Sequence, residues 1–263
     1  MERRPTILVI FGSTRQGRRG ERVVTWLMDR LAARPEASFK LVDVRDLALP
    51  LFDAPVAPAR GEIAPEAAAW AAQVDQADGF LFVTPEYNHG YPAVLKNAID
   101  HLYHQWVHKP AALVTYGGFA SGYRAAEQLR QVFVELTMVP VREQVGLSLV
   151  PGVTPGLGAE TGAASGPFLE RALDGLLEEL LWWTRVLTPA RARPCQCVIG
   201  LYGRHSWRGP RRLLAHEARE HPGHAAGGKL LHHLLHLLEL SEQRVDRLHL
   251  GVAQGRLIGD LGW

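Results

Sequence analysis

Two kinds of segment alternate along the first 150 residues of the chain. Short apolar runs rich in β-branched and aromatic residues are typical of strands that a parallel sheet buries on both faces. The longer segments between them place apolar residues three and four positions apart, which is the spacing of a helix with one buried face. The pattern predicts strands at residues 5–11, 39–44, 79–84, 111–115 and 141–149, and helices at residues 21–33, 66–77, 93–106, 124–136 and 167–187.

The alternation of strands and helices predicts the α/β fold class, with a doubly wound, five-stranded parallel sheet. In such sheets ligands bind beyond the carboxyl ends of the strands, where the connecting loops gather. Three loops at these ends are rich in glycine and polar residues, at 12–20, 85–91 and 116–123. We therefore expect the functional site at this edge of the sheet.

The composition is that of a globular protein. Of the 263 residues, 47% are hydrophobic and 21% are charged, a balance that excludes a disordered or fibrous chain. There is no apolar run of about 18 residues and no secretory signal pattern, so we expect no membrane segment and no export. The two cysteines, Cys195 and Cys197, are too few for a disulfide framework or a zinc site. We expect a cytoplasmic protein.

Charge divides the chain into two unlike parts. Residues 1–188 hold 18 basic and 21 acidic residues, a net charge of −3, whereas residues 189–263 hold 11 basic and 6 acidic residues and 8 of the 12 histidines. We predict one domain at residues 1–193 and a basic, His/Leu-rich C-terminal extension of uncertain structure at residues 194–263. The extension has no nucleic-acid docking motif, so we expect no nucleic-acid partner.

The first loop, GSTRQGRRG, follows a predicted buried strand and precedes a helix. Hydroxyl groups of Ser13 and Thr14, backbone N–H groups and the helix N-terminus would converge there, as a phosphate group requires. Arg15 and Arg18 would add charged donors. The loop matches neither the P-loop nor the GxGxxG pattern of dinucleotide sites. The alternative is an ordinary surface turn with solvated arginines.

The other two loops offer a flat surface rather than charge. In TPEYNHGYPAVLKNAID, Pro85 ends the strand, and Tyr87 and Asn88 follow. Such a loop offers backbone amides and an aromatic face to a flat heterocycle, although Tyr87 could equally be packed in a rigid turn. Gly117 and Gly118 follow the next strand, where the absence of side chains lets a ring approach the backbone. Together the three loops fit a mononucleotide.

The segments GSTRQGR, PEYNHGYPAVLKNAID and YGGFASGYRAAEQLR, in this order and spacing, resemble the NADPH-dependent FMN reductase family of flavodoxin-like proteins. The resemblance covers residues 5–193. It implies the strand order 2-1-3-4-5, a noncovalently bound FMN, and a homodimer or homotetramer that packs partly through the helix following PEYN.

Carried over residue by residue, the resemblance implies three groups of FMN-binding residues. The phosphate would be held by Ser13, Arg15 and Arg18, with backbone contacts from Thr14 and Gly17. The isoalloxazine and ribityl would be lined, mostly through backbone groups, by Pro85, Glu86, Tyr87 and Asn88. The polar edge of the ring would be bordered by Gly117 and Gly118. No catalytic side chain and no metal are expected, because the cofactor performs the chemistry.

The function that the resemblance implies is an NAD(P)H-dependent oxidoreductase. NADPH or NADH would pass a hydride through the flavin N5 to a small-molecule acceptor, which could be a quinone, free flavin, an azo compound or a metal oxyanion. One alternative is a flavodoxin-like electron carrier, but such carriers are strongly acidic and the first part of this chain is not. Another is an FMN-binding regulatory module, for which the basic extension is the only support.

The spacing of three histidines raises the question of a metal site. His101, His104 and His108 follow one another at spacings of three and four, at the end of the predicted helix 93–106. We prefer an interface between subunits, because no further ligand or supporting shell is identifiable. His89, in the PEYNHGY loop, is interpreted as a loop histidine without a catalytic role.

Overall fold

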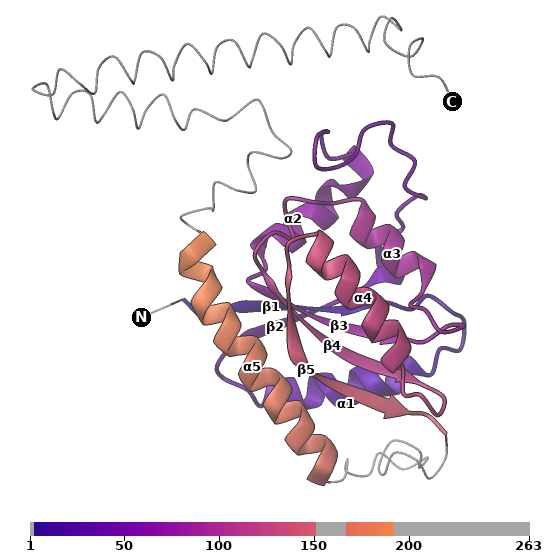
Figure 1. Ribbon diagram of the computed structural model, residues 1–263, viewed down its shortest axis with the longest axis vertical. Coiled ribbons are helices and arrows are strands. Elements are labelled where there is room, and N and C mark those ends of the chain that lie inside the picture. Colours follow the sequence, from indigo (N-terminus) through magenta and orange to yellow (C-terminus); the bar gives the residue numbers. More distant parts are fainter. Residues whose placement is uncertain (1–2, 151–166, 192–263) are drawn as a thin grey trace, which may run out of the picture. The chain divides into compact units, whose positions relative to one another are not determined.

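The structure, a computed structural model, describes residues 3–150 and 167–191 (Figure 1). The predicted domain boundary at residue 193, the extension 194–263 and the two cysteines lie outside the described residues. Within the described part, none of the helices combines the length and the apolar character needed to cross a membrane.

Five strands form one sheet in the order β2-β1-β3-β4-β5, and each neighbouring pair is parallel. This confirms the predicted doubly wound sheet and its 2-1-3-4-5 order. All five predicted strands exist, with bounds that differ by a few residues at most. The strands are β1 Thr6–Phe11, β2 Ser38–Asp43, β3 Gly79–Pro85, β4 Pro110–Gly117 and β5 Val139–Ser148.

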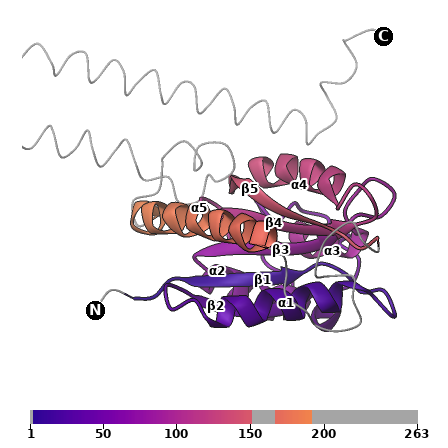
Figure 2. The same cartoon turned by 90° about the horizontal axis from the view of Figure 1, so that it is seen from below.

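Helices cover both faces of the sheet (Figures 1 and 2). One apolar core joins the sheet to α1 and α5, and the other joins it to α2, α3 and α4. Short 3-10 turns lie at Val44–Leu47 and Pro65–Ala67. The helices are α1 Gly20–Ala32, α2 Ala68–Gln76, α3 Ala93–Asp100, α4 Tyr123–Glu135 and α5 Pro167–Arg191.

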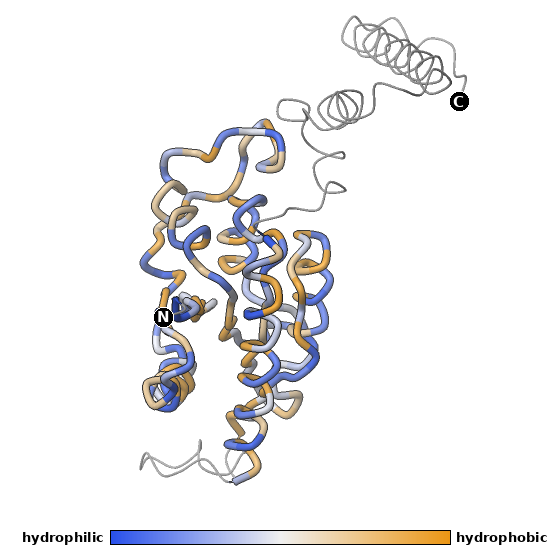
Figure 3. The backbone as a smooth tube through the Cα atoms, turned by 90° about the vertical axis from the view of Figure 1, so that its left-hand side faces the viewer, coloured by the Kyte–Doolittle hydropathy of each residue, from blue (hydrophilic) through white to orange (hydrophobic). Residues whose placement is uncertain are grey.

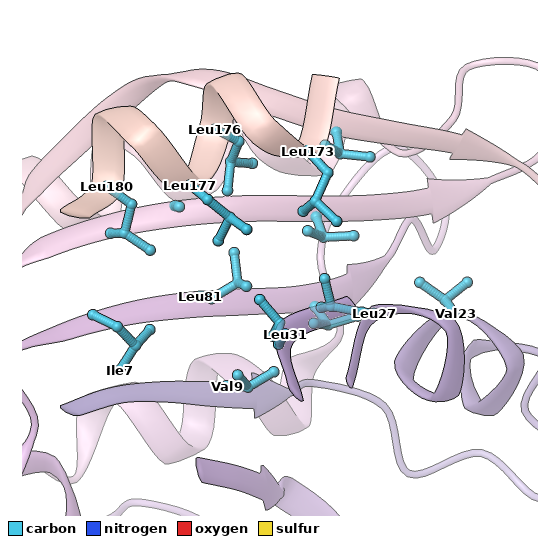
Figure 4. Close-up of a cluster of buried hydrophobic side chains, with 14 of the residues drawn as sticks. Ile7, Val9, Val23, Leu27, Leu31, Leu81, Leu173, Leu176, Leu177 and Leu180 are labelled. Carbon is cyan, nitrogen blue, oxygen red and sulfur yellow. The ribbon is translucent and has the colours of Figure 1, made fainter. Parts of the chain in front are cut away.

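The core explains why these segments fold as they do. Leu27 and Leu31 of α1 and the leucines of α5, among them Leu176, point toward the strands (Figure 4). Figure 3 shows hydrophobic and hydrophilic residues alternating along the tube through the helices, as expected for helices with one face on a sheet. The central strand β3 is buried along its whole length. Its carboxyl end therefore has a fixed place in the sheet, and so does the loop that follows it.

The helix predicted at residues 93–106 ends earlier, because α3 stops at Asp100. Trp106 is fully buried, and its indole nitrogen donates to the carbonyl oxygen of Ile99 at 3.1 Å. Its ring packs against Trp70 and Phe80, with centroid distances of 5.8 and 4.9 Å. The helix ends before Trp106, and the tryptophan packs into the core that α3 shares with α2 and α4.

The early end of α3 also removes the helical face expected for three histidines. The Nε2 atom of His101 lies 3.0 Å from the carbonyl oxygen of Pro50, and that of His104 lies 3.2 Å from the carbonyl oxygen of Ala59. These contacts fasten the segment before α2 to the turn after α3. Among the described residues, no group of three or more His, Cys, Asp or Glu side chains is arranged to hold a metal ion.

Candidate functional site

A cavity of about 370 Å³ lies at the carboxyl edge of the sheet, where the loops after β1, β3 and β4 meet. Its volume is within the range of about 300–1,000 Å³ that small-molecule sites occupy. It therefore lies where the fold class predicts a ligand. The lining residues are Ser13, Arg15, Gly17, Arg18, Arg19, Pro85, Glu86, Tyr87, Tyr116, Gly117, Gly118, Leu149 and Val150.

Nine of the eleven residues predicted for cofactor binding line this cavity. The other two are Thr14 and Asn88. Thr14 lines a smaller neighbouring cavity of about 140 Å³. Asn88 occupies a turn in which the backbone groups of Tyr87 and Gly90 exchange hydrogen bonds of 2.8 and 3.0 Å.

The first loop presents hydrogen-bond donors to the cavity. Gly12 begins it by donating to the carbonyl oxygen of Val83 at 2.9 Å, which ties the loop to β3. Within the described residues, the backbone N–H groups of Ser13, Thr14 and Arg15 have no protein acceptor. The exposed guanidinium of Arg15 lies 5.7 Å from the ring centroid of Tyr87. Free N–H groups, a helix N-terminus and a nearby cation form a suitable site for an anion.

Arg18 has partners other than those expected of a phosphate ligand. Its Nη1 donates to Oδ1 of Asp43 at 2.8 Å and its Nε to Glu21 at 3.2 Å, and it also donates to the carbonyl oxygen of Ser13. The side chain is only 5% exposed. The hydrogen bond to Asp43 raises the pKa of Arg18 despite the opposing effect of burial. The structure thus uses Arg18 to fix the shape of the first loop.

Two buried polar atoms in the cavity wall have no partner among the described residues. They are the Tyr116 hydroxyl and the Oε2 atom of Glu86. Buried polar groups are nearly always hydrogen-bonded, and leaving one unsatisfied costs about 1–3 kcal/mol. Both residues line the cavity.

Tyr116 owes its position to a glycine at the start of α1. A Cβ atom on Gly20 would overlap the Tyr116 hydroxyl, so only glycine lets the tyrosine lie against the helix N-terminus. Burial raises the pKa of Tyr116 well above its usual value. The hydroxyl therefore keeps its proton.

Two glycines leave the third loop open. A Cβ atom on Gly118 would meet no atom within 4 Å, so this position borders free space. A Cβ atom on Gly117 would lie 3.2 Å from the backbone nitrogen of Gly122, which is a tight contact. The wall is thus bare backbone at this point, as predicted for close approach of a ring.

Sequence reasoning missed four residues of the cavity wall: Arg19, Tyr116, Leu149 and Val150. Tyr116 precedes the Gly117–Gly118 pair directly, and its place at the end of a strand could have indicated it. Leu149 and Val150 follow β5, and the N–H of Leu149 donates to the carbonyl oxygen of Gly117 at 2.8 Å. Only the pairing of β4 with β5 brings them to the site.

Comparison with known proteins gives a match to one protein family. Residues 5–151 match the model of the NADPH-dependent FMN reductase family. An NAD(P)H-dependent FMN reductase of Schizosaccharomyces pombe is 40% identical over 157 residues, which cover 57% of this chain and 78% of the relative. A quinone reductase of Pseudomonas putida is 34% identical over 140 residues, covering 51% of this chain and 72% of the relative.

The fold has matching solved structures. A flavoenzyme NAD(P)H:(acceptor) oxidoreductase from Paracoccus denitrificans aligns with a TM-score of 0.56 and 19% identity, covering 70% of this chain and 98% of the other. At this identity the likeness concerns the fold alone.

The family match spans more than half of the chain, and its bounds enclose all three loops of the site. It confirms the expectations of an oxidoreductase that uses FMN and NAD(P)H, and it does not favour the non-catalytic electron carrier. The chain belongs to the NADPH-dependent FMN reductase family.

Proposed function

We propose that the cavity binds FMN with its phosphate against the first loop and its isoalloxazine between the second and third loops. The observation that carries this proposal is the pair of orphaned polar atoms, on Tyr116 and Glu86, in the wall of a cavity that also holds free N–H groups and Arg15. The cavity supplies an anion site at one end and bare backbone at the other. FMN has the matching charge distribution, so the residues present fit this cofactor.

At the phosphate end, the backbone N–H groups and the α1 N-terminus supply hydrogen bonds and positive potential. Ser13 and Arg15 are proposed as side-chain ligands, with Thr14 and Gly17 contributing backbone groups. Thr14 lines the smaller cavity, so we limit its proposed contribution to its N–H. We assign Arg18 an indirect role, because its guanidinium is already bound to Asp43.

At the ring end, Pro85, Glu86, Tyr87 and Asn88 are proposed to line the isoalloxazine and ribityl. Gly117 and Gly118 would border the polar edge of the ring, and Tyr116 is added as a donor to a ligand oxygen. The open space beside Gly118 would leave the flavin accessible to a second molecule. Access of this kind is what a flavin reductase requires of its protein.

When bound, FMN would supply the hydride chemistry between NADPH or NADH and an acceptor. The task of this chain is to hold the cofactor, to orient the ring and to leave room for each substrate in turn. We propose a small-molecule acceptor of the quinone, free flavin, azo or metal oxyanion class. Quinone reductases among the relatives support the first of these.

We also propose a homodimer or homotetramer and a cytoplasmic location. The support for the oligomer is the sequence resemblance to a family with such assemblies. The support for the location is the small number of cysteines, which suits a reducing compartment.

The test is an anaerobic titration of the purified, FMN-loaded protein with NADPH. Loss of the yellow absorbance is expected, and a flavin that stays oxidised would refute hydride uptake. A parallel test replaces Arg15 with Ala. We expect FMN to bind about tenfold more weakly, because a hydrogen bond to a charged group is lost, while riboflavin, which lacks the phosphate, binds as before. Arg22→Ala, an exposed change on the outer part of α1, is the matched control.

A further inference from the structure

Arg124, on the first turn of α4, lies outside the cavity lining but contacts two residues of the second loop. Its Nε lies 2.7 Å from Oε1 of Glu86, and its Nη1 lies 2.6 Å from Nε2 of His89. A single guanidinium thus connects a residue of the cavity wall with a residue of the turn that follows it.

Of these two partners, the buried Glu86 carboxylate depends more on the positive charge of Arg124. Its side chain is 8% exposed, whereas that of Arg124 is 47% exposed. Burying a carboxylate is costly unless it is paired with a positive charge and hydrogen-bonded. Arg124 satisfies one oxygen, and Oε2 has no partner among the described residues. The carboxylate is therefore held in place by one oxygen while the other still lacks a donor.

The turn itself depends on α4. Asn88 and His89 both adopt left-handed backbone conformations, with φ of 49° and 71°, which non-glycine residues rarely do. Asn tolerates this conformation better than His. The carbonyl oxygen of His89 accepts a hydrogen bond from Nε2 of Gln128 at 3.1 Å. Arg124 therefore contacts the ring of His89, and Gln128, one helical turn further along α4, contacts its backbone.

We propose that Arg124 is a positioning residue for the flavin ring: it holds Glu86 so that the unpartnered oxygen accepts a hydrogen bond from the ring N3–H. This proposal rests on FMN binding in the cavity. The imide N3–H is the N–H donor on the polar edge of oxidised isoalloxazine, and Glu86 lies next to the glycines proposed to border that edge, with its Cβ 3.5 Å from where a Cβ on Gly117 would lie.

The pairing also sets the charge beside the ring. Reduced flavin carries more negative charge than oxidised flavin, so a bare carboxylate nearby would disfavour reduction and lower the midpoint potential. Arg124 offsets that charge. Removing the arginine and removing the carboxylate should therefore shift the potential in opposite directions, which a general loosening of the loop would not do.

The experiment uses the full chain, freed of flavin and reconstituted with FMN or with 3-methyl-FMN, in which a methyl group replaces the N3 proton. We expect the wild-type protein to bind FMN about tenfold more tightly than 3-methyl-FMN. In Glu86→Gln and in Arg124→Ala this ratio should fall toward one. The midpoint potential of bound FMN should rise in Glu86→Gln and fall in Arg124→Ala, and Arg124→Lys should restore part of both effects.

Glu127→Gln, an exposed carboxylate on the same helix, is the matched control and should leave the ratio and the potential unchanged. A wild-type protein that binds both flavins equally, or potentials that shift in the same direction in both variants, would overturn the role of Arg124 and Glu86. Failure of the wild-type chain to bind FMN at all would instead overturn the proposed function.

Discussion

The side-chain oxygens of Ser13 and Tyr87 lie 2.8 Å apart, so a hydrogen bond joins the loop after β1 to the loop after β3. Ser13 is fully buried, and both residues line the cavity. The contact brings together the two regions proposed for the phosphate and the ring. Together with the hydrogen bond from the Gly12 N–H to the Val83 carbonyl oxygen, it helps to set the shape of the cavity.

Replacing Tyr87 with Phe should weaken FMN binding by about three- to tenfold, because the ring is kept while the hydrogen bond to Ser13 is lost. Equilibrium titration of the flavin-free protein, followed by quenching of FMN fluorescence, measures the effect. Tyr123→Phe removes a hydroxyl from a half-exposed tyrosine outside the cavity lining and serves as control. Equal affinities for wild type and Tyr87→Phe would show that the contact does not shape the site.

The pair of Arg18 and Asp43 should make the stability of the fold depend on pH in the acid range. Burial acts to raise the pKa of Asp43, but hydrogen bonds from Arg18 and from the Arg45 N–H outweigh it, and the pKa is lowered below 3.8. A lowered carboxyl pKa stabilises the folded state above the pKa of the unfolded chain, and this contribution is lost as pH falls through the folded value.

The wild-type free energy of unfolding should therefore decrease more between pH 5 and pH 3 than that of Asp43→Asn. Urea denaturation at each pH, followed by circular dichroism, measures the difference. Parallel pH dependence in the two proteins would show that folding does not lower the pKa of Asp43.

Replacing Gly20 with Ala should displace Tyr116 from the α1 N-terminus, since the added Cβ would overlap its hydroxyl. Both the fold and the site would suffer, with a destabilisation of about 1–3 kcal/mol from overpacking and weaker FMN binding. Gly175→Ala is the control, because its added Cβ would meet no atom within 4 Å and helices favour Ala over Gly. Equal stability and equal FMN affinity of wild type and Gly20→Ala would show that the site accommodates the added Cβ without overpacking.

Lys109 should make the fold more stable at alkaline pH. Burial lowers the pKa of Lys109 to about 8, with a further lowering effect of Arg191 that Asp75 and Asp78 oppose. Its Nζ donates to the carbonyl oxygens of Val74 and Asp75 at 2.7 and 2.9 Å. Because the unfolded chain binds this proton more tightly, the free energy of unfolding should rise as pH increases from about 8 toward 10.

Lys109→Met keeps the length of the side chain and removes the titrating group, so its rise in stability over this pH range should be smaller than that of wild type. Urea denaturation at pH 7.5 and 9.5 gives both slopes. An identical rise in the two proteins would mean that Lys109 does not titrate there.

Sequence reasoning was most successful where a local pattern is sufficient. A strand such as Gly79–Pro85, apolar along its whole length, can only be stable when both faces are covered. The helix prediction was wrong at the end of α3, since the spacing of apolar residues continues to Trp106 although the helix stops at Asp100. The burial of the Trp106 ring against Trp70, far away in the sequence, overrides the local preference.

At the candidate site too, local sequence patterns were sufficient for some predictions, whereas tertiary contacts decided others. The rule that loops gather at the carboxyl edge of a parallel sheet brought Ser13, Tyr87 and Gly117 into one prediction, and the three residues line one cavity. Arg18 is predicted as a phosphate ligand from its position in the loop, and it lines the cavity. The loop sequence gives no sign of Asp43, which lies at the end of a neighbouring strand and binds the guanidinium.

The sequence by itself determined the alternating fold, the edge of the sheet where the cavity lies and the loops that line it, because these follow from periodicity and from glycine and polar residues at fixed places. Only the tertiary structure decided which charges pair and which polar atoms stay without a partner. Arg124 reaches Glu86, and Tyr116 lies against Gly20, through contacts between separate elements. Such contacts depend on distances that the packed sheet and helices establish.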